Sequence, residues 1–228
     1  MTKLKAISAL YLLLLSFSVA ADDMHMEDDP LLFMFSINEL ERHDADGNPL
    51  SWNAEAWLGK DLNKFRLKTE GERINDKTES AEVQALYSHA IAPYWDLQLG
   101  ARNELHPDTG HEWAVIGLQG LAPYWFEINA ALFIGEDNRT ALRFEAEYEI
   151  LFTQKLILSP EIELNFYSKD DPELGIGSGL SEIDASLRLR YEIRRELAPY
   201  IGINWARVYE MAGDTEDSKF VLGFKMWL

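Results

Sequence analysis

The chain has 228 residues, a length that suits one large domain. Its 39 acidic against 21 basic side chains give a formal charge of −18, which argues against nucleic acid as a partner and favours cations. Because cysteine is absent, disulfides and thiolate metal sites are excluded. Aromatic residues make up 12% of the chain, a content expected of a protein with aromatic girdles at two membrane interfaces.

The N-terminus has the parts of a secretory signal peptide. Lys3 and Lys5 precede an apolar run over 6–19, and small residues follow at the expected cleavage site. A permanent membrane anchor is the alternative, but the run falls short of the roughly 20 residues that a spanning helix needs. We expect Sec-type removal of residues 1–21, then a short Met/His/acidic periplasmic tail over 22–30 and one domain over 31–228.

From Leu32 onward apolar residues recur at every second position, the period of a β-strand. In the segment NRTALRFEAEYEILF, for example, Leu142 and Phe144 share one face while Arg143 and Glu145 share the other. Strands of soluble sandwiches average about 5–6 residues. These runs reach the roughly ten residues that cross a bilayer at a tilt, so they are typical of a membrane barrel.

The alternating segments predict the topology. We expect twelve strands, over 31–40, 50–59, 63–72, 81–90, 94–104, 112–121, 124–134, 138–152, 155–167, 181–195, 200–209 and 218–228. Connections after even-numbered strands are short, whereas those after odd-numbered strands, such as 73–80, are mostly longer and polar. Short periplasmic turns and longer extracellular loops are typical of outer-membrane barrels. The predicted fold is therefore all-β, a transmembrane antiparallel up-and-down β-barrel of about 12 strands.

The tripeptide Ala-Pro-Tyr occurs three times, in IAPYW at 91–95, LAPYW at 121–125 and LAPYI at 197–201. Proline is tolerated in a turn because its missing N–H costs little there. We expect all three copies to form periplasmic turns, with the following aromatic residue at the membrane interface. The C-terminal KFVLGFKMWL alternates in the same way and resembles the ending of bacterial outer-membrane barrels, with Leu228 where Phe is commoner.

If the apolar faces meet lipid, charged residues line the lumen. The predicted lumenal acids are Glu55, Glu70, Glu72, Glu82, Asp96, Glu104, Glu127, Glu145, Glu147, Glu149, Glu161, Glu163, Glu182, Asp184 and Glu192. The predicted lumenal bases are Arg66, Lys68, Arg102, Arg143, Arg188, Arg190, Arg194 and Lys225. A twelve-strand barrel is narrow, so we expect much of this charge to pair across the interior. The excess of acid still leaves an interior that attracts cations.

Candidate metal ligands are few, because thioether suits Cu(I) and imidazole suits Cu(II) or zinc. The candidates are Met24, His25, Met26, Met34, His43, His106 and His111. The first three lie in the tail, Met34 points inward from the first strand, and the last three lie in or beside extracellular loops. His106 and His111 flank one turn and could share a metal. A hydrolase would need a serine activated by a histidine, and the adjacent Ser88–His89 pair does not supply one, so we expect no enzyme.

Long runs of the chain, including ERHDADGNPLSWNAEAWLGKDLNKFRLKTEGER and LRLRYEIRRELAPYIGINW, resemble the bacterial outer-membrane copper-resistance protein B family over residues 30–228. The resemblance implies an outer-membrane barrel that binds copper and acts in copper tolerance beside periplasmic multicopper oxidases. Family members often carry a long Met/His-rich region ahead of the barrel, whose place is taken here by Met24, His25 and Met26. We therefore expect a Gram-negative outer-membrane protein that binds copper, as Cu(I) or Cu(II), or aids its passage. The alternative is a general narrow porin or plugged structural barrel without specific metal binding.

Overall fold

The computed structural model describes residues 29–75, 77–105, 110–170, 177–210 and 213–228. The chain divides into two units, Met1–Pro30 and Leu31–Leu228, and the second holds all the strands described below. The predicted signal peptide and residues 22–28 of the predicted tail lie outside the described residues. None of the described helical segments has the length and apolar character of a membrane-spanning helix.

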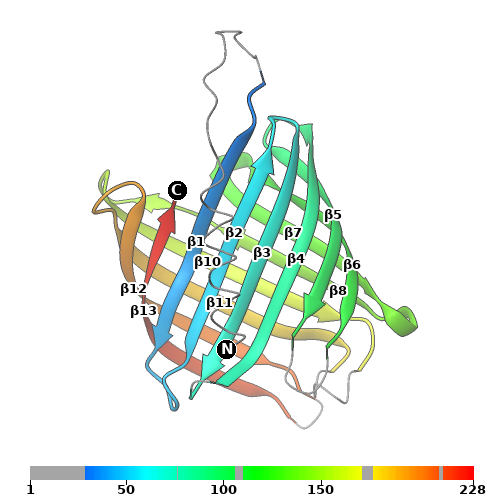
Figure 1. Cartoon of the computed structure of the whole chain (residues 1–228). Coiled ribbons are helices and arrows are strands. Elements are labelled where there is room, and N and C mark those ends of the chain that lie inside the picture. Colours follow the sequence, from blue (N-terminus) through cyan, green and yellow to red (C-terminus); the bar gives the residue numbers. More distant parts are fainter. Residues whose placement is uncertain (1–28, 76, 106–109, 171–176, 211–212) are drawn as a thin grey trace, which may run out of the picture. The chain divides into compact units, whose positions relative to one another are not determined.

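Within the described residues, thirteen strand segments form a single sheet. Their bounds are β1 (Leu32–His43), β2 (Leu50–Gly59), β3 (Asn63–Ile74), β4 (Lys77–Ala92), β5 (Trp95–Glu104), β6 (Glu112–Ala122), β7 (Phe126–Gly135), β8 (Thr140–Glu147), β9 (Ile150–Leu151), β10 (Leu156–Tyr167), β11 (Gly179–Tyr191), β12 (Leu197–Val208) and β13 (Thr215–Trp227). Strands that follow each other in the chain pair antiparallel, except that β8 and β9 both pair with β10, and β13 pairs with β1 through Leu40 and Phe224. Residues 31–228 thus form a closed up-and-down barrel, as predicted (Figure 1).

Strands β8 and β9 are two parts of one wall strand, so the barrel has twelve wall strands. Both parts pair with β10, and the interruption lies at Tyr148 and Glu149. The Tyr148 N–H donates to the Pro160 carbonyl at 3.1 Å. Proline has no N–H to return a bond across the pair, so the ladder is broken at this point. The predicted single strand over 138–152 is therefore interrupted at Tyr148, which lies opposite Pro160.

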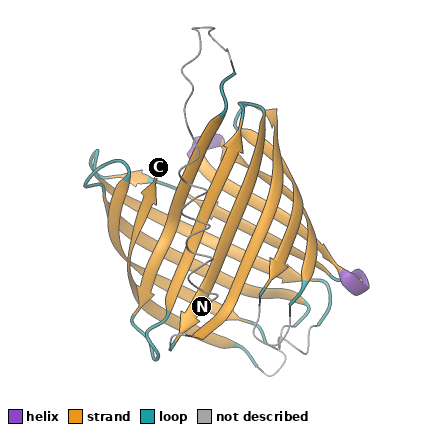
Figure 2. Cartoon of the chain, in the orientation of Figure 1, coloured by secondary structure: helices purple, strands orange, loops and turns teal. Residues whose placement is uncertain are grey.

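The two faces of the wall differ as the alternation predicts. On β13, the side chains of Phe220 and Leu222 are 67% and 64% exposed on the outside, whereas Val221 between them is buried. On β8, Leu142 is exposed and Arg143 is buried in the lumen. The outer surface of the barrel is thus apolar and the lumen receives most of the charge. The wall that separates the two is built of strands, and the loops lie at its ends (Figure 2).

The connections gather at two ends of the barrel, here named the turn rim and the loop rim (Figure 1). The turn rim holds the connections at 60–62, 93–94, 123–125, 152–155 and 192–196. The loop rim holds the described residues of the other connections, at 44–49, 75, 105, 110–111, 136–139, 168–170, 177–178, 209–210 and 213–214. The predicted long loop over 73–80 is wrong, because β3 continues to Ile74 and β4 begins at Lys77.

At the loop rim, the Ser178 N–H donates to Asp170 at 2.7 Å, which lowers the pKa of that carboxyl.

Two of the three Ala-Pro-Tyr copies form turns and the third does not. Tyr94 and Tyr124 both have φ of 68°, follow a strand end, and expose 68% and 83% of their surface at the turn rim. The third copy lies inside β12, where Pro199 pairs with Phe224. Its Tyr200 is only 4% exposed and points into the lumen, so the predicted interfacial position is wrong for this residue.

Gly223 on β13 makes room for the Tyr200 ring. A Cβ at this position would lie 2.7 Å from the ring hydroxyl and 2.7 Å from the Leu40 carbonyl oxygen, closer than real Cβ atoms come. Gly223→Ala is expected to destabilise the barrel by about 1–3 kcal/mol through overpacking. The urea midpoint of the barrel, followed by its heat-modifiable migration on gels, measures the change. Gly117→Ala, whose Cβ would make ordinary contacts from 3.4 Å, is the matched control, and an equal loss there would contradict the argument.

Candidate functional site

The lumen contains two cavities that follow each other along the barrel. The turn-side cavity has a volume of about 420 Å³ and is lined by residues such as Met34 and Lys225. The loop-side cavity has a volume of about 800 Å³ and is lined by residues such as His43 and Lys219. The residues that line both are Glu39, Asn53, Glu70, Glu82, Arg143, Glu145, Glu161 and Arg188. This shared set marks the level at which the two cavities meet.

A strip of carboxylates runs along one side of the lumen, on β7, β8, β10 and β11. We call it the acidic lane, and its members are Glu127, Glu145, Glu147, Glu161, Glu163, Glu182 and Asp184. The register places like charges directly opposite each other: Glu145 faces Glu163, which in turn faces Asp184. Facing carboxylates repel each other and destabilise a sheet. The lane therefore favours a cation between its members, and it continues from one cavity into the other.

Several carboxylates of the lane bind neutral amides. Asn129 donates to Glu145 at 2.9 Å, and Asn204 donates to Asp184 at 2.7 and 2.9 Å. Asn165 donates to Glu163 at 2.6 Å and to Glu182 at 3.3 Å. An amide donor satisfies an acceptor without neutralising its charge. The negative charge of this side of the lumen is therefore only partly compensated.

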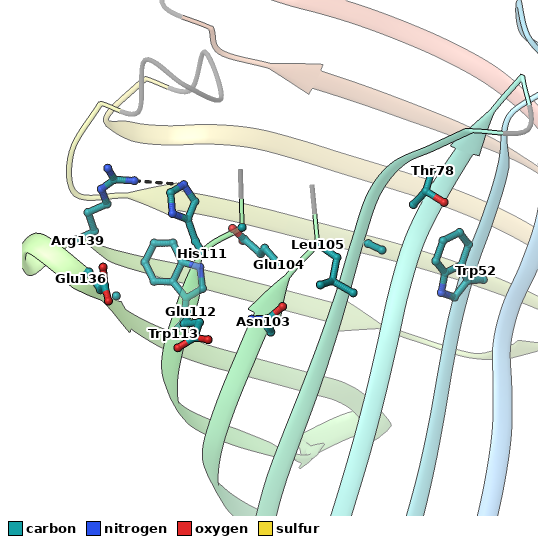
Figure 3. A pocket seen from close by; sticks show the side chains of 13 residues that line it. Trp52, Thr78, Asn103, Glu104, Leu105, His111, Glu112, Trp113, Glu136 and Arg139 are labelled. Carbon is teal, nitrogen blue, oxygen red and sulfur yellow. Dashed lines mark hydrogen bonds between the residues drawn. The ribbon is translucent and has the colours of Figure 1, made fainter. Parts of the chain in front are cut away.

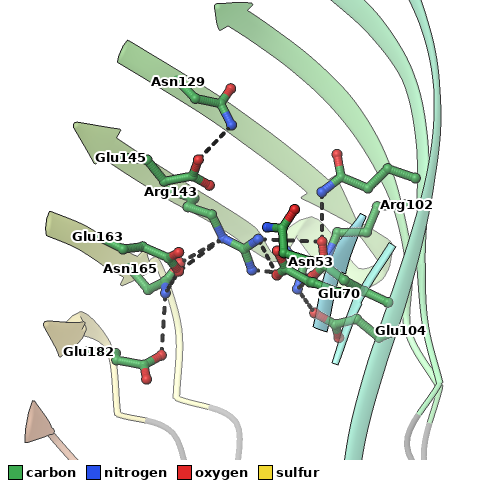
Figure 4. Close-up of polar contacts among 12 residues, drawn as sticks. Asn53, Glu70, Arg102, Glu104, Asn129, Arg143, Glu145, Glu163, Asn165 and Glu182 are labelled. Carbon is green, nitrogen blue, oxygen red and sulfur yellow. Dashed lines mark hydrogen bonds and ion pairs between the residues drawn. The ribbon is translucent and has the colours of Figure 1, made fainter. Parts of the chain in front are cut away.

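Arg143 links the lane to the opposite side of the barrel. From β8 it contacts Glu82 on β4 at 3.2 Å and forms an ion pair with Glu70 on β3 (Figure 4). Strands β4 to β7 lie between β3 and β8 in the sheet, so the side chain reaches across the lumen. It also contacts Glu163 of the lane at 3.3 Å.

Arg188 makes a second link between wall strands that are not neighbours, over a shorter part of the wall. From β11 it contacts Glu39 and Glu41 on β1, both at 3.0 Å, and it pairs with Glu161 of the lane. Strands β12 and β13 lie between β11 and β1. Each arginine is thus held by carboxylates on two separate sectors of the wall, which confirms that charge pairs across the interior.

Glu39 and Glu41 are absent from the predicted lumenal set because of a β-bulge. The register of β1 shifts between Ile37 and Glu39 against β2 and between Ile37 and Leu40 against β13. A one-residue shift moves every later side chain to the other face. Strict alternation continued from Phe35 and Ile37 therefore places these two carboxylates on the lipid side, although the step of the apolar positions from Ile37 to Leu40 marks the bulge in the sequence.

Glu192 and Arg194, both predicted to line the lumen, lie in the turn rim instead. β11 ends at Tyr191, and the isolated bridge between Arg194 and Leu197 closes the turn before β12. The cause is that β12 begins three residues earlier than predicted, at Leu197 rather than at residue 200. The lumenal charge is accordingly confined to the wall strands.

One sector of the lumen is apolar, contrary to the prediction of an ionic interior throughout. Its buried side chains come from β4, β6, β7 and β8, with Tyr167 of β10 packed against them: Leu86, Trp113, Val115, Ala131, Phe133 and Ala141. The guanidinium of Arg102 lies 4.4 Å from the centre of the Phe133 ring, and that of Arg143 lies 5.7 Å from it. This sector fills part of the narrow lumen and supports two arginines by cation–π contact.

A third cavity, of about 1040 Å³, opens at the loop rim (Figure 3). It is lined by two indoles, Trp52 and Trp113, and by His111, Glu104 and Arg139, among others. The Arg139 guanidinium lies 3.3 Å from the His111 ring nitrogen, and the His111 ring packs edge-on against Trp113. Glu104 lines both this cavity and the loop-side cavity, so the two share a carboxylate.

The structure places three of the seven predicted metal ligands. Met34 lines the turn-side cavity, His43 lines the loop-side cavity and His111 lies at the loop rim, so they lie in separate places. His43 Nε2 hydrogen-bonds Ser51 at 2.6 Å and lies 3.8 Å from Glu41. The other predicted ligands lie outside the described residues: Met24, His25, Met26 and His106. Among the residues that the structure describes, His, Asp and Glu form no group of three arranged to hold a metal ion.

The closed barrel of twelve wall strands gives residues 31–228 a porin-like fold. Two solved porins share the fold: the NanC porin, with a TM-score of 0.56 at 9% identity over 86% of this chain and 99% of that one, and the KdgM porin in complex with disordered oligogalacturonate, with 0.55 at 12% over 84% and 98%. At this identity the likeness shows the fold alone.

The family is shown by the sequence comparisons. The model of the family described as copper resistance protein B precursor (CopB) matches residues 31–228. The copper resistance protein B homolog of Pseudomonas syringae pv. tomato is 44% identical over 89% of this chain and 72% of its own length, and copper resistance protein B of Escherichia coli is 42% identical over 89% and 71%. The chain belongs to the copper resistance protein B family.

Proposed function

We propose that this chain is a barrel of the bacterial outer membrane that contributes to copper resistance by binding copper or aiding its passage through the lumen. Copper is the cargo in this proposal, and no catalysis is involved. Family membership supports the link to copper, and the porin-like fold and apolar outer face support the location in outer-membrane lipid. Cleavage of residues 1–21 as a signal peptide, and a periplasmic multicopper oxidase as a partner, belong to the same proposal.

The acidic lane is the observation that carries the proposal. It extends through both cavities, so a cation meets carboxylates over the length of the lumen. Several weak sites in series favour passage, because each must bind the ion and then release it. Amide donors keep part of the lane charged, which sustains the attraction.

Selectivity for copper would come from softer ligands at the two ends of the lumen. His43 lies beside Glu41 in the loop-side cavity, and Met34 lies in the turn-side cavity. Imidazole and thioether bind copper better than they bind calcium or magnesium. A copper ion would thus meet one borderline ligand at the loop side and one soft ligand at the turn side, with the carboxylates between them.

A general narrow porin or plugged structural barrel is the second candidate. The two cross-lumen arginines favour it, because they occupy the lumen and neutralise part of its acid. In this case the charged side chains fill the lumen and stabilise the barrel, and His43 and Met34 do not bind copper.

Copper flux into proteoliposomes, followed with a copper-sensitive dye inside the vesicles, separates the two candidates. The double variant His43→Gln and Met34→Leu is expected to reduce copper flux by about tenfold while the flux of potassium stays unchanged. His89→Gln is the matched control, because His89 is exposed on the outer side of β4, where its ring bonds Asn63 at 2.8 Å. Equal copper flux in the wild type and the double variant would favour the plain porin.

A further inference from the structure

The two cross-lumen arginines lie where the turn-side and loop-side cavities meet. Arg143 and Arg188 both line the two cavities, as do their partners Glu70, Glu39 and Glu161. All of the ion pairs they form across the lumen join wall strands that are not neighbours in the sheet. Such pairs add nothing to the pairing of adjacent strands, and they place charged side chains in the path between the cavities.

The lumenal ion pair of Arg66 with Glu55 has a different geometry. Arg66 on β3 pairs with Glu55 on the adjacent strand β2 and contacts Asp96 on β5 at 3.1 Å. Glu55 and Arg66 line only the turn-side cavity, and the pair lies along one part of the wall. The Arg66–Glu55 pair therefore joins adjacent wall strands outside the level at which the two cavities meet.

We propose that the Arg143 and Arg188 bridges form a gate that closes the lumen at rest and opens when a divalent metal cation takes over their carboxylates. The inference rests on the proposed function only for the identity of the cargo. The two arginines form ion pairs with Glu82, Glu161 and Glu163. Carboxylates also coordinate metal cations. A guanidinium and an entering cation therefore compete for the same oxygens, and an arginine that loses its partners is free to leave the path.

The acidic lane provides the contact through which a bound cation would release Arg143. Glu145 lines both cavities and receives its hydrogen bond from Asn129. Directly opposite it, Glu163 holds Arg143 at 3.3 Å. A cation held between these two carboxylates would weaken the hold of Glu163 on Arg143, since a nearby positive charge repels the guanidinium. The structure thus couples occupancy of the lane to the Arg143 bridge.

Single-channel conductance in planar bilayers tests the gate, with the full-length gene product purified from outer membranes and potassium chloride as the only salt. The test variant removes both bridges without changing net charge, through Arg143→Gln, Glu70→Gln, Arg188→Gln and Glu39→Gln. The control removes the wall pair in the same way, through Arg66→Gln and Glu55→Gln. The wild type and control are expected to conduct weakly and the bridge variant several-fold more. A bridge variant that conducts no more than the wild type, or a control that rises equally, would overturn the gate.

A second measurement tests opening by cations on the wild-type protein itself. Copper(II) added on the loop side is expected to raise the potassium conductance of the wild type and to leave that of the bridge variant unchanged. An unchanged or lowered wild-type conductance would contradict release of the arginines by a cation. Because potassium carries the current, the gate can stand if the barrel proves unselective for copper, and copper flux can stand if the gate fails. Heat-modifiable migration on gels shows that each variant is folded.

Discussion

Arg143→Met is expected to destabilise the barrel by about 3–5 kcal/mol, the cost of removing one partner from a buried ion pair. Arg143 is 8% exposed and is shared by Glu70, Glu82 and Glu163. Without it, Glu70 and Glu163 lose the cation that contacts them, and Glu82 keeps Arg102 at 2.7 Å and the Gln84 amide at 2.6 Å. The urea midpoint of the purified barrel, read from heat-modifiable migration, measures the loss.

Two further variants distinguish burial from charge alone. Arg207→Met removes an arginine from the exposed pair with Asp214 at the loop rim and is expected to cost at most about 1 kcal/mol. Adding Glu70→Gln to Arg143→Met is expected to restore part of the stability, because one carboxylate no longer lacks a partner. A loss at Arg143 no larger than that at Arg207 would show that the bridge is too well solvated to matter.

Neutralising the middle of the acidic lane is expected to abolish most of the cation selectivity of the lumen. The variant combines Glu145→Gln, Glu163→Gln and Asp184→Asn, which face one another in one row across three strands. Rows of carboxylates are a common basis of cation selectivity in channels. The reversal potential under a potassium chloride gradient is expected to move towards zero as chloride begins to permeate.

The same variant should gain stability while it loses selectivity. Facing like charges cost about 0.2–1 kcal/mol per pair, so their removal is expected to raise the urea midpoint. The control neutralises three exposed carboxylates, two in the loop rim and one near the start of β4, through Asp44→Asn, Asp46→Asn and Glu79→Gln, and is expected to change the reversal potential little. A lane variant that keeps its selectivity would show that the loops, and not the lane, select the ion.

The strands could be predicted because the period of two is set by local chemistry. Lipid outside and charge inside force alternation along every wall strand, and most of the predicted strands lie within a few residues of the observed ones. The exceptions have physical causes. Pro160 interrupts the strand opposite it, and the third Ala-Pro-Tyr is tolerated inside β12, where Gly223 leaves room for the Tyr200 ring.

The lumen could be predicted only in part. Alternation identifies Glu145 and Arg143 as lumenal, but it cannot say which carboxylates an arginine reaches, because that depends on strands far apart in the chain. The bulge that turns Glu39 and Glu41 inward is marked only by the step of the apolar positions from Ile37 to Leu40, which strict alternation overlooks. The apolar sector had a signal in the sequence. Leu86 lies an even number of residues from Glu82 on the same strand, and Phe133 lies an even number from Glu127, so both side chains face the lumen.

The most direct test of a copper function in the lumen is a crystal of the purified barrel soaked with copper and measured at the copper absorption edge. The account predicts anomalous peaks inside the barrel, beside His43 in the loop-side cavity and along the acidic lane. Peaks confined to the outer surface or to residues before the barrel, with an empty lumen at saturating copper, would contradict it.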